Sequence, residues 1–176
     1  MRDSLIKYFF IILMMFSSGR AYSQSAGLLS FTVDPKMLVQ GPYTTSEHGA
    51  LDLTIRLACA GKRYEVGLFA EIFSEIEYYS FGFFSNYKIL LESKPKKFRR
   101  WVLPVGAEVG FIKRNSKIDV LKFNFALNGS LRYYFVKNVG LELGMNYRYR
   151  SDLEVLYHDN GQMRVNMFSG IVFRWP

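Results

Sequence analysis

Apolar and polar residues alternate strictly along several long segments of the chain. Between residues 122 and 135 one set of alternate positions is mainly large and apolar, and the other carries Asn124 and Arg132. Because successive side chains of a β-strand point to opposite faces, this period of two predicts a strand with one apolar and one polar face. Residues 139–150 and 163–175 repeat the pattern. A helix would scatter their charges around its circumference, so three strands are predicted here.

Further segments complete the set of predicted strands. They are shorter or less regular, and the first of them is the weakest, ending before Asp34-Pro35. Short connections separate the segments, and no helix of normal length is needed between them. Many evenly spaced strands with short turns predict a barrel or a sandwich. The five segments are residues 28–33, 51–59, 64–73, 79–89 and 101–112.

Two kinds of β-barrel differ in whether the apolar faces of their strands point inward or outward. A soluble barrel encloses its apolar side chains, whereas a membrane barrel turns them outward to lipid. The apolar faces here are about 10 or more residues long, which is what a tilted strand needs to cross a bilayer. Several of them end in aromatic residues, as expected where strands meet lipid head groups. The predicted aromatic girdle consists of Tyr64, Trp101, Tyr133, Phe135, Tyr147, Tyr149, Phe173 and Trp175.

The polar faces carry charges of both signs mixed with glycine. Opposite charges can pair across a narrow barrel, and glycine suits a crowded interior. Because hydrocarbon offers no partner for backbone N–H and C=O groups, a membrane sheet must close, and eight is the smallest usual strand count. We therefore predict an all-β, closed, antiparallel up-and-down transmembrane β-barrel of eight strands, filled by side chains. Its predicted lumen network consists of Arg56, Glu65, Glu71, Glu108, Arg132, Glu142, Arg148 and Arg164.

The first residues predict the compartment. Arg2 and Lys7 precede a short apolar run at residues 8–16, and Ala21-Tyr22-Ser23 resembles a cleavage site. This combination is typical of a secretory signal peptide, and the run is far shorter than the roughly 20 residues of a membrane-spanning helix. We expect residues 1–23 to be a cleaved signal peptide and residues 24–176 to form one barrel domain in the outer membrane.

The chain resembles the small bacterial outer-membrane β-barrel family, the group that contains the OmpA membrane domain and the OmpX-like proteins. The resemblance covers most of residues 24–176. It rests on the repeated alternation, on the strand WVLPVG at residues 101–106, and on the aromatic-rich last strand ending Phe173-Arg174-Trp175. It implies recognition of that last strand by the barrel insertion machinery. By the parity of the strands in such barrels, the connection near Ser74 should lie on the outer side.

Charge and candidate chemistry narrow the function. The formal net charge is +8, but an exported chain rarely meets nucleic acid, so anionic lipids and lipopolysaccharide are the expected partners. A Ser-His-acid site needs a histidine that can reach a hydroxyl, and both histidines, His48 and His158, fall in predicted loops. Cys59, the single cysteine, is expected to be a small apolar strand residue. No catalytic, cofactor or metal site is predicted.

The sequence leaves three functions open. The leading hypothesis is a non-enzymatic outer-membrane barrel with a structural, adhesive or surface-interaction role and no open pore. The second is a lipid-modifying enzyme of the lipid A acylase or deacylase type on the same barrel. The third is a soluble periplasmic barrel that binds an apolar ligand.

Overall fold

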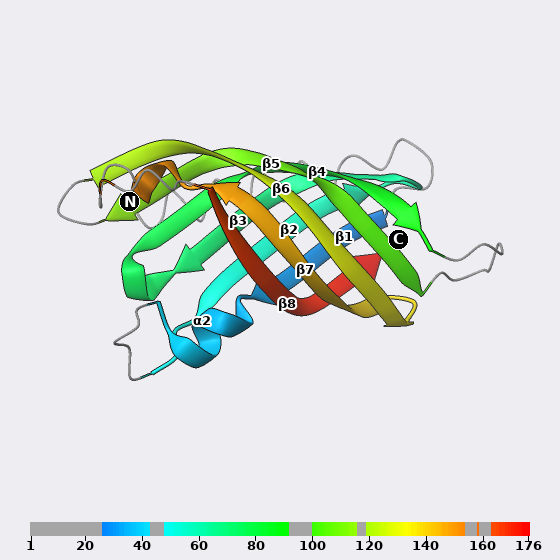
Figure 1. Cartoon of the computed structure of the whole chain (residues 1–176). Helices are drawn as coiled ribbons and strands as arrows, with labels where there is room; N and C mark the ends of the chain where they lie inside the picture. Colours follow the sequence, from blue (N-terminus) through cyan, green and yellow to red (C-terminus); the bar gives the residue numbers. More distant parts are fainter. Residues whose placement is uncertain (1–25, 43–47, 92–99, 116–118, 154–157, 159–162) are drawn as a thin grey trace, which may run out of the picture.

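The computed structural model is a closed antiparallel β-barrel of eight strands (Figure 1). It describes residues 26–42, 48–91, 100–115, 119–153, 158 and 163–176. The predicted signal peptide lies outside the described residues. Each strand pairs with its neighbours along the chain, and β8 closes onto β1. The elements are β1 Ala26–Val33, α2 Pro35–Gln40, β2 Asp52–Ala60, β3 Tyr64–Phe73, η1 Ser74–Ile76, β4 Tyr78–Leu90, β5 Trp101–Asn115, β6 Asp119–Val136, β7 Val139–Tyr149 and β8 Met163–Trp175.

The first strand, which has the weakest sequence pattern, closes the barrel. It pairs with β2 from Ala26 to Val33 and with β8 from Gly27 to Val33. Its backbone groups are therefore engaged on both sides, and no sheet edge is left open. The predicted fold class, a closed antiparallel up-and-down barrel of eight strands, is confirmed.

The short helix α2 between β1 and β2 was not among the predicted elements. Asp34 Oδ1 accepts hydrogen bonds from the backbone N–H groups of Lys36 at 2.8 Å and Met37 at 3.2 Å. Pro35 occupies the first helical turn, where its missing N–H leaves no hydrogen bond unmade. Asp34-Pro35 thus ends the strand, as predicted, and also begins a helix. Among the described residues no helix is long and apolar enough to cross a membrane.

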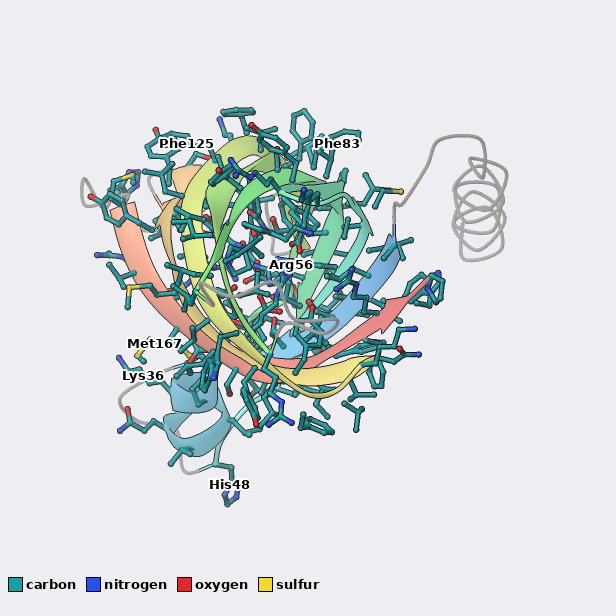
Figure 2. The ribbon with its side chains drawn as sticks, turned by 90° about the vertical axis from the view of Figure 1, so that its right-hand side faces the viewer. Lys36, His48, Arg56, Phe83, Phe125 and Met167 are labelled. Atoms are coloured by element: carbon teal, nitrogen blue, oxygen red, sulfur yellow. The ribbon has the colours of Figure 1, made fainter. Side chains whose placement is uncertain are left out.

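The barrel buries charges and exposes large apolar side chains. Figure 2 shows Arg56 inside the ring, while Phe83, Phe125 and Met167 point away from it. Only 4% of Arg56 is exposed, compared with 64% of Phe83. The outer surface carries exposed large apolar residues on β1 and from β3 to β8, and half-buried leucines and isoleucine on β2. This arrangement is the inverse of a water-soluble fold.

The interior also contains apolar side chains, although the inner faces were predicted to be polar. Leu28, Phe69, Phe84 and Val172 form part of a buried cluster in the half of the barrel that holds the start of β1 and the end of β8. Packing there is tight: a Cβ atom on Gly144 would lie 2.4 Å from the Phe168 ring. The lumen is therefore filled by salt bridges and apolar contacts together.

Candidate functional site

Arg132 is the centre of the first buried network in the lumen. It lies on β6 opposite Glu142 on β7, with its Nε 2.9 Å from Glu142 Oε1. Its Nη1 lies 2.7 Å from Glu65 Oε2 on β3, across the barrel. Ser130 donates a 2.7 Å hydrogen bond to Glu142, and Lys88 Nζ lies 3.9 Å from Glu65. The guanidinium is thus held between two carboxylates, as a buried cation requires.

Glu108 on β5 joins the second buried network. Its Oε1 lies 2.8 Å from Arg56 Nη2, and its Oε2 lies 3.2 Å from Arg148 Nη2. Ala126 on β6 is the cross-strand partner of both Glu108 and Arg148. Its side chain is only a methyl group, so it leaves room for the two longer side chains to meet over β6. Arg148 also pairs with Glu71 from β3. Strands far apart around the ring are tied together through one carboxylate.

The structure places the predicted lumen residues in these two networks, with the exception of Arg164. Arg164 is exposed and lies on β8 at the end of the barrel that holds α2. Sequence reasoning left out several charged residues that face inward. The alternation along the strands could have identified two of them, because Arg114 and Arg150 continue the inward positions of β5 and β7 by one step beyond Ile112 and Arg148. The residues left out are Lys88, Arg114, Arg150 and Asp152.

A third charged group closes the lumen near α2, and we call it the mouth cluster. Asp152 lies just beyond β7, with its Oδ2 3.1 Å from Arg114 Nε and its Oδ1 2.8 Å from Arg150 Nε. The Arg150 guanidinium lies 4.5 Å from the centre of the Tyr78 ring, a cation–π contact. Tyr78 Oη in turn accepts a 3.0 Å hydrogen bond from Arg148. The mouth cluster is therefore continuous with the second lumen network.

Acid should weaken the mouth cluster through Asp152. Burial alone would raise the pKa of its carboxyl, but the hydrogen bonds and charge of Arg150, with the charge of Arg114, hold that pKa below its ordinary value of 3.8. A lowered folded-state pKa contributes stability that is present above the ordinary value and lost as pH falls through the folded one. We expect Asp152→Asn to lower the unfolding free energy by about 1–2 kcal/mol at pH 7.

The pH dependence of that difference is the test. In urea titrations the difference between the two proteins should begin to shrink as the pH falls below the ordinary pKa of 3.8, and it should vanish once the pH is below the lowered pKa of the folded protein. A gap that stays constant from pH 7 to pH 3 would contradict the ionic role of Asp152.

A cavity of about 260 Å³ opens at the mouth, above Tyr78 and Glu71. Carboxylates of Asp34, Asp52 and Glu71 line it from the arc formed by β1, β2 and β3. Arginines line it from β5, from the end of β7 and from β8. The described lining is thus acidic along one arc of the ring and basic along the other.

The aromatic side chains predicted to form a girdle gather at both ends of the barrel. Most lie at the end that holds the start of β1 and the end of β8, and Tyr147 and Tyr149 lie at the α2 end. Several rings touch across strands: the centroids of Trp101 and Tyr133 are 4.6 Å apart, and those of Phe125 and Tyr149 are 5.3 Å apart. Such pairs suit a surface that meets both an apolar and a wet phase.

The end of the barrel opposite α2 is strongly basic. Where the structure describes this end, every exposed charged side chain is Lys or Arg, and the acidic Glu65 there is buried. We call this set the basic collar. It consists of Lys62, Arg63, Arg100, Lys137 and Arg174.

The described residues do not assemble a metal site. No group of three or more His, Cys, Asp or Glu residues among them could hold a metal ion. His48 and His158 are both exposed and lie outside the strands, and Cys59 is exposed on β2. The buried charged side chains that the structure describes lie in the lumen and at its mouth.

Replacing Glu142 with leucine should destabilise the barrel. Arg132 would keep Glu65, while Ser130 would lose its acceptor and the first network would gain one unpaired positive charge. We expect a loss of about 1–3 kcal/mol in unfolding free energy, measured by urea titration in detergent micelles. Glu75→Leu, the same change at an exposed site, is the control and should cost less than about 0.5 kcal/mol. Equal stability of the two variants would contradict the network.

Comparisons with known proteins bear on the fold. No protein-family model matches the chain, and no curated protein matches it. Among solved structures, Neisserial surface protein A (NspA) is 14% identical with a TM-score of 0.48, covering 86% of this chain and 94% of its own. The Yersinia pestis outer membrane protein Ail, solved in a phospholipid bilayer nanodisc, is 8% identical with a TM-score of 0.54, covering 87% of this chain and 100% of its own. The likeness to Ail is one of fold.

Proposed function

We propose that this chain is a non-enzymatic outer-membrane β-barrel with a surface-interaction role and no open pore. One observation carries the proposal: the buried face of the barrel is salt-bridged while its outer face is apolar. Phe83, Leu127 and Val165 are each 59–65% exposed. In water such a continuous apolar belt would drive association, whereas in lipid it needs no partner. A soluble barrel for an apolar ligand would need an apolar cavity where this lumen holds buried ion pairs.

Closure of the lumen supports the absence of a pore. An eight-stranded barrel is just wide enough for its side chains to fill it. Here Arg132 spans from β6 to Glu65 on β3, and Glu108 ties Arg56 to Arg148. Permeation would require breaking these buried ion pairs.

Further observations support the membrane setting and its orientation. Ail, which shares the fold, is an outer membrane protein. The basic collar is suited to anionic head groups at one interface, with the aromatic rings beside it. Strand parity assigns the α2 end to the cell surface, where lipopolysaccharide is the expected lipid partner. The closer kinship with OmpA and OmpX-like proteins, the cleaved signal peptide and the use of the insertion machinery rest on the sequence alone.

Fractionation combined with gel electrophoresis tests the proposal. We expect the protein in the outer membrane, released only by detergent, with a mobility that shifts on boiling. Purified protein in lipid vesicles should not admit small sugars in a swelling assay. A soluble periplasmic protein without a heat shift would overturn the membrane assignment, and rapid swelling would overturn the closed lumen.

A further inference from the structure

The basic collar differs in charge from the opposite end of the barrel. At the α2 end the exposed charged side chains have both signs, for example Glu75 and Glu77 beside Lys36. At the collar end every exposed charge that the structure describes is positive. Within the described part of the chain no carboxylate forms a salt bridge with four of the five collar residues, which are Lys62, Arg63, Lys137 and Arg174. Their charge is therefore available to a partner from outside the chain.

The turn that joins β2 to β3 holds two of these cations beside aromatic rings. The carbonyl oxygen of Arg63 accepts a 2.7 Å hydrogen bond from the Lys88 N–H on β4, which fixes the turn against that strand. The Arg63 guanidinium donates a 3.2 Å hydrogen bond to Tyr87 Oη. The Tyr87 ring packs edge-on against the Tyr64 ring, with their centroids 5.3 Å apart, and the two residues are 39% and 61% exposed. Lys62 and Arg63 thus border an exposed aromatic surface.

Lys137 and Arg174 form a second basic position, beside Trp175. Lys137 lies in the short turn between β6 and β7, and the Arg174 N–H donates a 2.8 Å hydrogen bond to the Asn138 carbonyl oxygen in that turn. Trp175 ends β8 and is 42% exposed. The β6–β7 turn is four strands away from the β2–β3 turn, so it lies on the opposite side of the eight-stranded ring.

We propose that the basic collar binds anionic phospholipids, with phosphate groups at the β2–β3 turn on one side of the barrel and at Lys137 and Arg174 on the other. A single small anion could not bridge cations on opposite sides of the ring, whereas the lipids that surround a barrel meet all of them. The exposed tyrosine and tryptophan rings belong where hydrocarbon meets head groups, which places the neighbouring cations at the depth of the phosphates. The inference deepens the proposed function and rests on it, because the collar meets lipid only if the barrel spans a membrane.

Net charge sets the preference among phospholipids. Phosphatidylglycerol carries one negative charge, whereas phosphatidylcholine and phosphatidylethanolamine carry a positive group that offsets their phosphate. A lysine or arginine close to anionic lipid is attracted to it, so phosphatidylglycerol should be enriched roughly two- to five-fold beside the collar. Because these charges are exposed, salt at about 1 M should remove most of the enrichment.

Tryptophan fluorescence can measure this enrichment. The two tryptophans of the chain, Trp101 and Trp175, lie at the collar end and are 41% and 42% exposed. Trp101→Phe leaves Trp175 as the reporter beside Lys137 and Arg174. The mature protein with this change is folded into phosphatidylcholine vesicles that contain a minor fraction of brominated phosphatidylglycerol or, in parallel, of brominated phosphatidylcholine. Bromine quenches tryptophan on contact, so we expect the brominated phosphatidylglycerol to quench Trp175 more strongly.

Charge variants test whether the collar causes the preference. Lys137→Gln combined with Arg174→Gln should abolish most of the difference between the two brominated lipids. Lys36→Gln combined with Lys122→Gln removes the same charge from exposed positions at the α2 end and should leave the difference unchanged. The heat shift on gels shows in each case that the variant has folded.

The outcomes separate this inference from the proposed function. Equal quenching by the two brominated lipids would overturn the inference and still show that the barrel lies in the bilayer. An undiminished preference in the variant that lacks Lys137 and Arg174 would also overturn it. Quenching by neither lipid would overturn both the inference and the membrane setting on which it rests.

Discussion

Glu108→Leu should cost about 3–5 kcal/mol of unfolding free energy, the largest effect expected of any single lumen substitution. Glu108 is 1% exposed and is the carboxylate that two buried arginines share. Without it Arg148 would keep Glu71, but Arg56 would retain a 3.4 Å hydrogen bond to Thr32, the face of the Phe168 ring and the charge of Glu142, which is already paired with Arg132. The cost comes from a desolvated guanidinium left without its counter-charge. Urea unfolding from lipid vesicles measures it.

A second variant separates lost charge balance from lost packing. Arg56→Leu combined with Glu108→Leu restores the balance of the second network, because Arg148 and Glu71 still neutralise each other. Replacing a buried ion pair with apolar residues of similar size is often neutral, so the double variant should recover most of the lost stability. The coupling energy of the double-mutant cycle then reports the interaction. A double variant less stable than the single one would show that shape, and not charge, dominates at Glu108.

The sequence was sufficient to predict the strands and the direction of their faces. A period of two over about 10 residues leaves few alternatives, so β3, for example, was predicted with its observed bounds of residues 64–73. Arg132 and Glu142 could be assigned to the same inner face because both lie in phase along regular strands. Their direct pairing could not be predicted from the short turn between β6 and β7, because a one-residue register shift between Tyr134 and Val136 brings Glu142 opposite Arg132.

Features that depend on neighbouring strands could not be predicted in the same way. Alternation does not reveal that Ala126 lies between Glu108 and Arg148, because that depends on the registers of two separate strand pairs. Nor does it place Asp152, which lies beyond the end of β7. The short helix α2 had a local signal in Asp34-Pro35, but six residues contain too little periodicity to distinguish a helical turn from a loop.

Leu127→Arg should destabilise the barrel by about 2–4 kcal/mol in a bilayer, while Leu121→Arg should cost only about 0–1 kcal/mol. The two leucines make a matched pair, since both lie on β6 and both are 59% exposed. Leu127 lies in the middle of the strand, next to Ala107 on β5 and Tyr147 on β7. Leu121 lies beyond the part of β6 that pairs with β7, which begins at Phe125.

The difference between these variants should report depth in the membrane, because the two leucines are equally exposed. β6 contains 18 residues, more than the 9–11 or so that a tilted strand needs to cross the hydrocarbon, so its end at Leu121 should reach water or head groups. On a water-soluble barrel both substitutions would add a surface arginine and should each cost less than about 0.5 kcal/mol. If both variants lose the same unfolding free energy in vesicles, the proposal that the barrel spans a membrane is wrong. A difference of at least about 1 kcal/mol between them would place Leu127 in the hydrocarbon layer.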